Sequence, residues 1–424
     1  MNLGSIKHVH FIGVGGIGIS ALAKMFLLEA KTVSGSDMSE SQIASDLSRN
    51  GAQIFISHSK ENIPPNTQLV IYTIAVNEEN EELLHAKTLG IPCLSYPEAL
   101  GLISRDKTTI AISGTHGKTT TTAMIAHLML ELQMAPTVIV GSKLADKQSN
   151  FIAGNSEYLV VEACEYRRSF LNLHPTFLVI TNIEEDHLDY YKDLDDIKSA
   201  FFELASRVPQ NGAIVTNTET KEWLKKVGIK APIYDYENIN AVPKLLTPGK
   251  HNQANARAAI QAVSLIHRGE IPPYLETFKG TWRRLEYKGS KQNCIYFDDY
   301  AHHPTEIKSS LLALRQEYPE RKIICVFEPH QQSRTKALFE GFVEALQIAD
   351  KCFIAPILCV REQYDPEITN EKLSKAVSKF VPSNPVETPE ELKCEIKKLD
   401  PSLEYCVVLM GAGNIYKWTE TIMK

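Results

Sequence analysis

Residues 110–119 combine the residue types that hold a nucleotide phosphate. The apolar run IAIS leads into the turn GTHG, and a helix pattern begins at Lys118; the turn is two residues tighter than G-x-x-x-x-G-K-[ST]. Such a turn leaves backbone N–H groups at a helix N-terminus, where the dipole favours anions, while Lys118 reaches the outer phosphates and Thr119 ligates Mg²⁺. The alternative is a structural glycine turn beside a surface lysine. The predicted phosphate-binding residues are Gly114, Thr115, His116, Gly117, Lys118, Thr119 and Thr120.

A second glycine turn, GVGGIG at residues 13–18, follows the apolar run HVHFI and opens a helix pattern. An acidic residue ends the next strand pattern about 20 residues later, which is typical of dinucleotide-binding turns. The same turn accepts any pyrophosphate, and it also occurs as a packing turn without a ligand. Two phosphate sites on separate domains favour an enzyme that joins two substrates, ATP and an acceptor that carries a diphosphate. The residues of this second set are Gly13, Gly15, Gly16, Ile17, Gly18 and Asp37.

These turns belong to a chain in which short apolar runs alternate with helix patterns of about 10 to 15 residues, the arrangement of repeated βα units. The sequence therefore predicts an α/β protein with largely parallel sheets. Three blocks follow one another, and a Pro- and Gly-containing linker, GEIPPYLETFKGTW, precedes the last. The predicted domains are a Rossmann-like domain over 1–105, a central P-loop ATP-binding sheet over 106–285 and a Rossmann-like α/β domain over 286–424.

The composition excludes several classes of protein. With 424 residues the chain can bury more than one core, which excludes small metal- or disulfide-dependent scaffolds. The balance of 45 Lys+Arg against 51 Asp+Glu gives a net charge of −6, the wrong sign for a protein that mainly binds nucleic acid or an anionic membrane. No apolar run reaches about 18 residues, and no signal peptide pattern opens the chain. Eight scattered cysteines without a C-x-x-C pair predict a reducing, cytoplasmic location.

Seven further motifs occur in order behind the glycine turn and its helix, GVGGIGISALA. They are GTHGKTTTT, VVEACEYRRSFL, TNIEEDHLDYY, GKHNQANARAA, WRRLE, DDYAHHPTEI and EPHQQSRT. Together they resemble the Mur ligase family over nearly the whole chain. The resemblance implies an N-terminal domain for a UDP-sugar, a central ATPase and a C-terminal domain for an amino acid.

The motif set is most similar to the branch of this family that works on UDP-N-acetylmuramate. This implies that ATP, with Mg²⁺, phosphorylates the lactyl carboxylate of UDP-N-acetylmuramate, and that L-alanine attacks the acyl phosphate to form an amide in peptidoglycan precursor synthesis. The expected partners are these small substrates, with no nucleic acid and no membrane, and the expected state is a monomer or weak homodimer.

The resemblance also implies roles for single residues. It adds Glu162 and His187 to Thr119 as metal ligands, although Mg²⁺ prefers oxygen and spacing alone leaves His187 as a base or a surface residue. Asn252 is either a contact to ATP or a helix cap. Arg283 and Arg284 either both clamp the transferred phosphoryl group, or one of the two is only solvated. The implied catalytic set is Lys118, Glu162, His187, Tyr300, His302 and Arg334. The remaining implied contacts are His251, Asn252, Asn255 and Arg284 for ATP and Thr73 for the UDP-sugar.

Two departures from the family pattern keep other functions open. Gln331 stands where family members often carry an arginine, so recognition of the amino-acid carboxylate depends on fewer charges. The segment 217–249 is short, which predicts a trimmed sheet edge with the phosphate and metal motifs intact. The alternatives are a sister ligase for another amino acid or a peptide, an NAD-dependent oxidoreductase built on the first domain, and an inactive nucleotide sensor.

Overall fold

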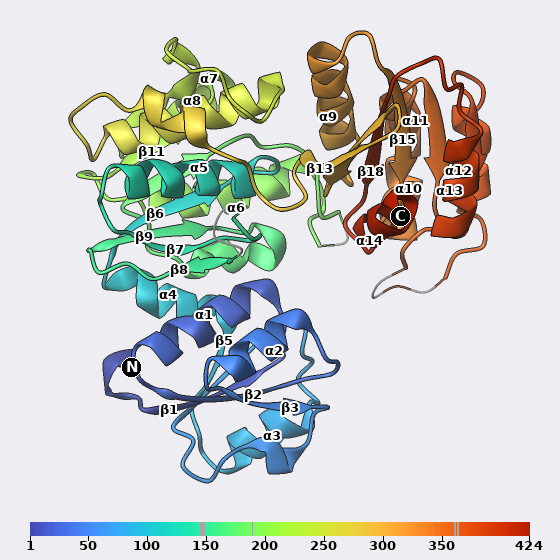
Figure 1. Cartoon of the computed structure of the whole chain (residues 1–424). Coiled ribbons are helices and arrows are strands. Elements are labelled where there is room, and N and C mark those ends of the chain that lie inside the picture. The colour runs from blue at the N-terminus through green and yellow to red at the C-terminus, as the bar shows by residue number, and fades with distance from the viewer. Residues whose placement is uncertain (145–148, 189, 360–361, 363) are drawn as a thin grey trace. The chain divides into compact units, whose positions relative to one another are not determined.

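A computed structural model describes residues 1–144, 149–188, 190–359, 362 and 364–424. In these residues, three sheets follow one another along the chain, each flanked by helices (Figure 1). The predicted α/β class with largely parallel sheets is confirmed. The chain packs as two compact units, Met1–Pro243 with Asn255–Leu275, and Lys244–Ala254 with Glu276–Lys424. The first unit holds the first two sheets and the second unit holds the third; the domain boundaries at residues 105 and 285 stay predictions.

The first sheet has five parallel strands in the order β3-β2-β1-β4-β5. Because β1 lies in the middle with its neighbours leading away on both sides, the loop after β1 opens at the switch point where such sheets bind ligands. The strands are β1 (His8–Ile12), β2 (Thr32–Asp37), β3 (Gln53–Ile56), β4 (Leu69–Tyr72) and β5 (Cys93–Ser95). The helices are α1 (Ile17–Leu28), α2 (Gln42–Arg49), α3 (Glu81–Thr88) and α4 (Tyr96–Arg105).

The central sheet has seven strands in the order β12-β11-β10-β6-β9-β7-β8, all parallel except for the pair β7 and β8. Strand β6 lies between β10 and β9, so the carboxyl ends of these three strands meet at one edge. The strands are β6 (Thr108–Ser113), β7 (Thr137–Ile139), β8 (Phe151–Ile152), β9 (Tyr158–Glu162), β10 (Phe177–Ile180), β11 (Ala213–Thr216) and β12 (Ile233–Asp235). The helices are α5 (Lys118–Glu131), α6 (Leu194–Ser206), α7 (Thr218–Lys226) and α8 (Lys250–Ser264).

The third sheet has six strands in the order β13-β14-β18-β15-β16-β17, in which only β13 runs antiparallel to its neighbour. The last strand of the chain, β18, is thus inserted between β14 and β15. The strands are β13 (Glu286–Lys291), β14 (Cys294–Asp299), β15 (Lys322–Phe327), β16 (Lys351–Ile354), β17 (Ser383–Pro385) and β18 (Tyr405–Met410). The helices are α9 (Pro304–Glu317), α10 (Gln332–Ala337), α11 (Phe339–Leu346), α12 (Asn370–Val377), α13 (Pro389–Lys397) and α14 (Tyr416–Met423).

The apolar runs of the sequence form the cores because parallel strands are buried on both faces. In β15, Ile323, Cys325 and Phe327 pack in one cluster with α9 and α11, whereas Ile324 and Val326 pack in another with α13 and α14. All eight cysteines are unpaired thiols. Among the described residues, no helix has both the length and the apolar character that crossing a membrane requires.

Candidate active site

The turn between β6 and α5 is closed by glycines that cannot be replaced without strain. Gly114 has φ of 128° and Gly117 has φ of 84°, both in the region that favours glycine. A β-carbon on Gly114 would collide with Thr181 Oγ1, and one on Gly117 would collide with the side chain of Asn255. The structure thus brings Asn255, at the first unit's end of α8, to the predicted phosphate turn.

The middle of the turn is fixed by the chain that follows β10. The amide of His116 donates to Asn182 Oδ1 at 2.9 Å, and Asn182 Nδ2 donates to the His116 carbonyl at 3.1 Å. The Glu184 amide donates to Thr115 Oγ1 at 2.8 Å, and the His116 ring lies 3.5 Å from the Glu184 carboxylate. The turn is therefore held in shape before any phosphate binds.

Lys118 begins α5 and folds its ammonium back over the turn. Its Nζ donates to the carbonyls of Gly114 (2.6 Å) and Thr115 (2.9 Å) and to Glu165 Oε1 (2.9 Å). Burial acts to lower the pKa of Lys118, but the nearby carboxylates, Glu165 foremost, outweigh it and raise the pKa. Lys118 is consequently a fixed cation at the mouth of the turn.

Thr119 and Glu162 form a pair of oxygen donors beside Lys118. The Thr119 hydroxyl lies 3.1 and 3.0 Å from the two Glu162 carboxylate oxygens, and the Gly141 amide donates to Glu162 Oε2 at 2.8 Å. Glu162 ends β9, as its position after the run YLVV predicts. A hydroxyl and a carboxylate are the hard oxygen ligands that Mg²⁺ prefers, so the chemistry of this pair fits that ion.

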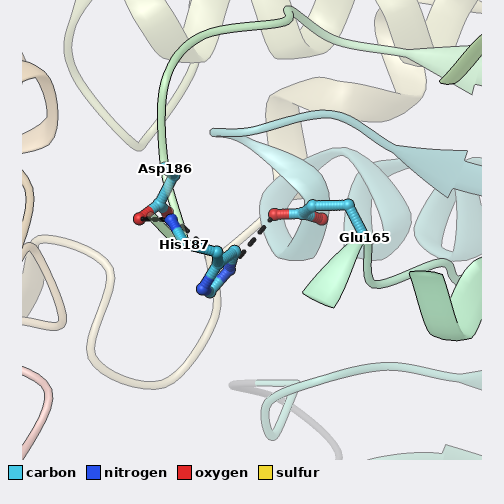
Figure 2. Close-up of side chains that lie close together, drawn as sticks. All are labelled: Glu165, Asp186 and His187. Carbon is cyan, nitrogen blue, oxygen red and sulfur yellow. Dashed lines mark hydrogen bonds and ion pairs between the residues drawn. The ribbon is translucent and has the colours of Figure 1, made fainter. Parts of the chain in front are cut away.

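His187 contacts a carboxylate that the sequence analysis did not single out. Figure 2 shows His187 between Asp186 and Glu165: its Nε2 lies 3.4 Å from Glu165 Oε1 and 3.8 Å from Asp186 Oδ2. The three side chains place one possible ligand atom each within 4.8 Å of one another. Glu165 therefore joins His187 to Lys118. The sequence signal for Glu165 was the spacing E-A-C-E, which places a second carboxylate three residues after Glu162.

The N-terminal glycine turn is built by its neighbouring strands. The Gly15 amide donates to Asp37 Oδ2 at 2.8 Å, so Asp37 holds the turn. Thr73 follows β4, its amide donates to the Ile12 carbonyl at 3.0 Å, and its methyl group fills the space that a side chain at Gly13 would need. The structure thus groups Gly13, Asp37 and Thr73 at the carboxyl edge of the first sheet.

A mainly apolar pocket of about 270 Å³ in the first unit adjoins both predicted sites. The start of α1 contributes Ile17 and Gly18, and the end of β9 contributes Glu162. Tyr96 and Phe170 supply aromatic walls. Glu162 and the last two residues of the glycine-turn motif, Ile17 and Gly18, therefore line one shared space.

In the second unit, the carboxyl edge of the third sheet gathers the predicted amino-acid site. His302 Nδ1 lies 3.0 Å from the Tyr300 carbonyl, and the two rings meet edge to face with centroids 5.4 Å apart. His330, which the sequence analysis did not single out, links them to Arg334: its ring lies 6.0 Å from that of His302, and its Nδ1 lies 3.2 Å from Arg334 Nη1. His330 is the histidine of the motif EPHQQSRT, and its place in that motif is the sequence feature that could have predicted its part in this site.

The two arginines of the motif WRRLE differ in their surroundings. Arg283 is buried, donates to the Gly411 carbonyl and packs its guanidinium over the rings of Tyr300 and Tyr416, at 4.9 and 4.5 Å. Arg284 is partly exposed, 3.6 Å from Glu306 Oε1. Of the pair, Arg284 is the one placed to reach a ligand, and Arg283 packs inside the domain rather than being solvated.

The start of α8 corrects one expectation. The helix begins at Lys250, so Asn252 lies inside its first turn, and its side chain donates to the Pro248 carbonyl at 2.9 Å instead of capping the helix. His251 lies beside it in the second unit, and a β-carbon on Gly249 would collide with the His251 ring and with Ala313. The cap prediction for Asn252 is wrong because Pro248-Gly249 lets the helix start three residues earlier, at Lys250 rather than Gln253.

Acid is expected to destabilise the protein through His251. Burial, with the positive charge of Arg284, lowers the pKa of His251 from 6.5 to about 4. The unfolded chain takes up this proton near 6.5, so between pH 6.5 and about 4 the proton favours the unfolded state and stability falls as the pH falls. The test is the fall in Tm between about pH 7.5 and 4.5, measured by thermal unfolding. This fall should be smaller for His251→Asn than for the wild type. Burial raises the pKa of Asp298 to about 6, so protonation of Asp298 stabilises the folded state as the pH falls, but it does so equally in the wild type and in His251→Asn. If the two proteins lose the same amount of Tm between about pH 7.5 and 4.5, His251 is not the group responsible.

Comparison with known proteins matches nearly the whole chain to one family. Models described as "Mur ligase family, catalytic domain", "Mur ligase middle domain" and "Mur ligase, glutamate ligase domain" match residues 8–108, 112–263 and 283–413. The chain is similar to the UDP-N-acetylmuramate–L-alanine ligase of Clostridium acetobutylicum, at 38% identity over 98% of this chain and 97% of that one. It is 39% identical to the enzyme of the same name from Clostridium tetani, over 99% and 98% of the two chains. The crystal structure of the UDP-N-acetylmuramate–alanine ligase of Thermotoga maritima matches with a TM-score of 0.80 at 28% identity, over 98% of both chains.

Proposed function

The chain belongs to the Mur ligase family, and on this premise we propose that it uses ATP to join L-alanine to the lactyl carboxylate of UDP-N-acetylmuramate in peptidoglycan precursor synthesis. The observation that carries this proposal is the full-length similarity to relatives of that activity. The site agrees with it, because Lys118 and the Thr119–Glu162 pair lie together at the carboxyl edge of the central sheet.

The reaction needs ATP because a carboxylate is a poor electrophile. The γ-phosphoryl group passes from ATP to a lactyl carboxylate oxygen, which releases ADP and leaves an acyl phosphate. The alanine amine, after losing a proton, attacks the acyl carbon, and the tetrahedral intermediate collapses to the amide as the bond to the phosphate oxygen breaks. Lys118 and the amides of the turn stabilise the charge that develops on the transferred phosphoryl group, which is the main way enzymes accelerate phosphoryl transfer.

We assign the metal site to Thr119 and Glu162, to which the family resemblance adds His187. A bound Mg²⁺ supplies neutralisation of phosphate charge. The chain itself keeps both donors oriented, since Gly141 fixes one Glu162 oxygen and the start of α5 fixes Thr119. His187 lies next to Glu165, so its role in holding metal stays a proposal.

The remaining substrate groups are assigned by chemistry. Gly13, Gly15, Asp37 and Thr73, which lie at and beside the glycine turn before α1, are assigned to the diphosphate and ribose of the UDP-sugar, because a helix N-terminus favours anionic groups. In the second unit, Tyr300, His302 and Arg334 suit the alanine end, because the planar arginine fork matches a carboxylate. His251, Asn252 and Arg284 are assigned to ATP. A monomer or weak homodimer in the cytoplasm completes the proposal, consistent with eight unpaired thiols.

Phosphate release from ATP tests the function directly. The full chain is incubated with ATP, Mg²⁺ and UDP-N-acetylmuramate, and single amino acids are added one at a time. L-alanine should give the largest kcat/KM, with L-serine and glycine as the nearest competitors because their side chains are closest to that of alanine in size. Release that depends on another amino acid or on a peptide would replace this proposal by a sister ligase. A change in NADH absorbance with no phosphate release would favour the oxidoreductase.

A further inference from the structure

Glu165 is the most deeply buried carboxylate of the phosphate site. The residue is 2% exposed, and it lies three residues after Glu162, in the turn that follows β9. One oxygen, Oε1, lies 2.9 Å from Lys118 Nζ and 3.4 Å from His187 Nε2. The other, Oε2, is buried without a hydrogen-bond partner among the described residues. A single carboxylate oxygen thus connects Lys118 of the phosphate turn to His187 in the turn after β10, and Figure 2 shows the contact to His187.

The backbone around this oxygen is held in costly conformations. Arg167, Arg168 and His187 have φ of 51°, 55° and 54°, in the left-handed region that non-glycine residues rarely adopt. The Tyr191 hydroxyl donates to the Glu165 carbonyl, and the Arg168 amide donates to the same carbonyl at 2.9 Å. Such strain persists only where surrounding contacts impose it, and it clusters at functional sites.

The charges explain why a carboxylate is needed here. The side chain of Lys118 is 14% exposed, and its three N–H donors go to two turn carbonyls and Glu165. Burial acts to raise the pKa of Glu165, but Lys118 and His187 outweigh it and lower the pKa. Of the three acceptors, only Glu165 carries a charge, so it is the counterion that keeps a buried ammonium stable until phosphate arrives.

We propose that Glu165 is a positioning residue. Its Oε1 holds the side chains of Lys118 and His187 at a fixed position relative to each other, and this fixes where the Lys118 ammonium lies during phosphoryl transfer. This role rests on the proposed ligase function. Glu165 does not itself touch the phosphate. Its loss should affect the transition state more than the binding of ATP.

Glu165→Gln separates these two effects, because glutamine keeps the shape and an acceptor oxygen but removes the charge. An uncompensated Lys118 attracts the triphosphate at least as strongly as before, so the Kd for a fluorescent ATP analogue should not rise. A loosened Lys118 and His187 should lower kcat for phosphate release by about 10- to 100-fold, the cost of a small misplacement of a catalytic group. General damage to the fold would instead weaken ATP binding.

Two further variants sharpen the test. Tyr191→Phe removes the hydroxyl bonded to the Glu165 backbone but leaves the carboxylate, so its Kd should stay within about threefold of wild type and its kcat should fall less than that of Glu165→Gln. Glu165→Asp keeps the charge but shortens the reach, so it should bind the analogue normally and give a kcat between those of wild type and Glu165→Gln. If Glu165→Gln does not fold, the aspartate variant alone decides, and a wild-type kcat in it overturns the proposal.

Three results overturn the positioning role: a kcat of Glu165→Gln within threefold of wild type, a Kd that weakens in both Glu165→Gln and Tyr191→Phe, or a Kd that weakens in Glu165→Gln alone. Failure of the proposed function looks different. In that case the wild-type chain releases no phosphate with UDP-N-acetylmuramate and L-alanine. The ATP-binding arm needs no acceptor and still tests Glu165, because weaker binding by Glu165→Gln with unchanged binding by Tyr191→Phe would assign Glu165 to ATP binding itself.

Discussion

Replacing Lys118 by alanine is expected to lower kcat by about 10²- to 10³-fold, or ~3–4 kcal/mol of transition-state stabilisation. Lys118 is the cation folded over the phosphate turn, 2.6 and 2.9 Å from the carbonyls of Gly114 and Thr115. Charge moves onto the transferred phosphoryl group at this place, and no other lysine lies in residues 114–119. Steady-state phosphate release at saturating substrates measures the effect.

The control for this prediction is Lys107→Ala. Lys107 precedes the same strand, β6, at the opposite edge of the sheet, and its Nζ donates to the Ser156 carbonyl at 2.8 Å. It should keep kcat within about threefold of wild type. Because Lys118→Ala leaves Glu165 buried without its cation, the double variant Lys118→Ala/Glu165→Gln removes that charge and should be more stable than the single variant but no more active. A Lys118→Ala enzyme within tenfold of wild type contradicts the assignment of this turn.

The phosphate turn could be predicted because its chemistry is contiguous. Gly114, Gly117, Lys118 and Thr119 follow one another, and a strand-turn-helix pattern alone places them at a helix N-terminus. The position of Glu162 could be predicted because it ends an apolar strand, whereas its role as a metal ligand is implied only by the family resemblance. The three-sheet architecture could be predicted because strand and helix patterns alternate throughout the chain.

The contacts that the sequence did not reveal depend on neighbours far apart along the chain. The contacts of Glu165 with Lys118 and His187 depend on the turn after β9 and on the positive φ of His187. Neither feature can be recognised from a pattern in the amino-acid sequence. Arg283 and Arg284 are adjacent and alike, and only packing against Tyr416 and Gly411 separates the buried one from the accessible one. The insertion of β18 between β14 and β15 is likewise a long-range event.

Glu162→Gln is expected to have the second largest effect, a fall in kcat of about 10²-fold together with a roughly 10- to 100-fold rise in the Mg²⁺ concentration that gives half-maximal activity. Glutamine keeps an oxygen near the Thr119 hydroxyl and the Gly141 amide, so the local fold should survive. What it loses is the negative charge that makes this pair a site for a hard cation. A titration of phosphate release with MgCl₂, at fixed ATP, measures both numbers.

The carboxylate at the other end of the same strand provides the comparison. Glu157 immediately precedes β9, and its Oε2 accepts from the Thr108 hydroxyl at 3.1 Å, at the edge opposite the site. Glu157→Gln should leave the Mg²⁺ titration unchanged. If Glu162→Gln lowers kcat with no change in the Mg²⁺ requirement, Glu162 is not a metal ligand and the cation belongs with Glu165, Asp186 and His187, the cluster whose ligand atoms lie within 4.8 Å of one another. Glu162 and Glu165, three residues apart in E-A-C-E, are thus distinguished by two measurements. Replacing Glu162 should change the Mg²⁺ concentration for half-maximal activity, whereas replacing Glu165 should change kcat alone.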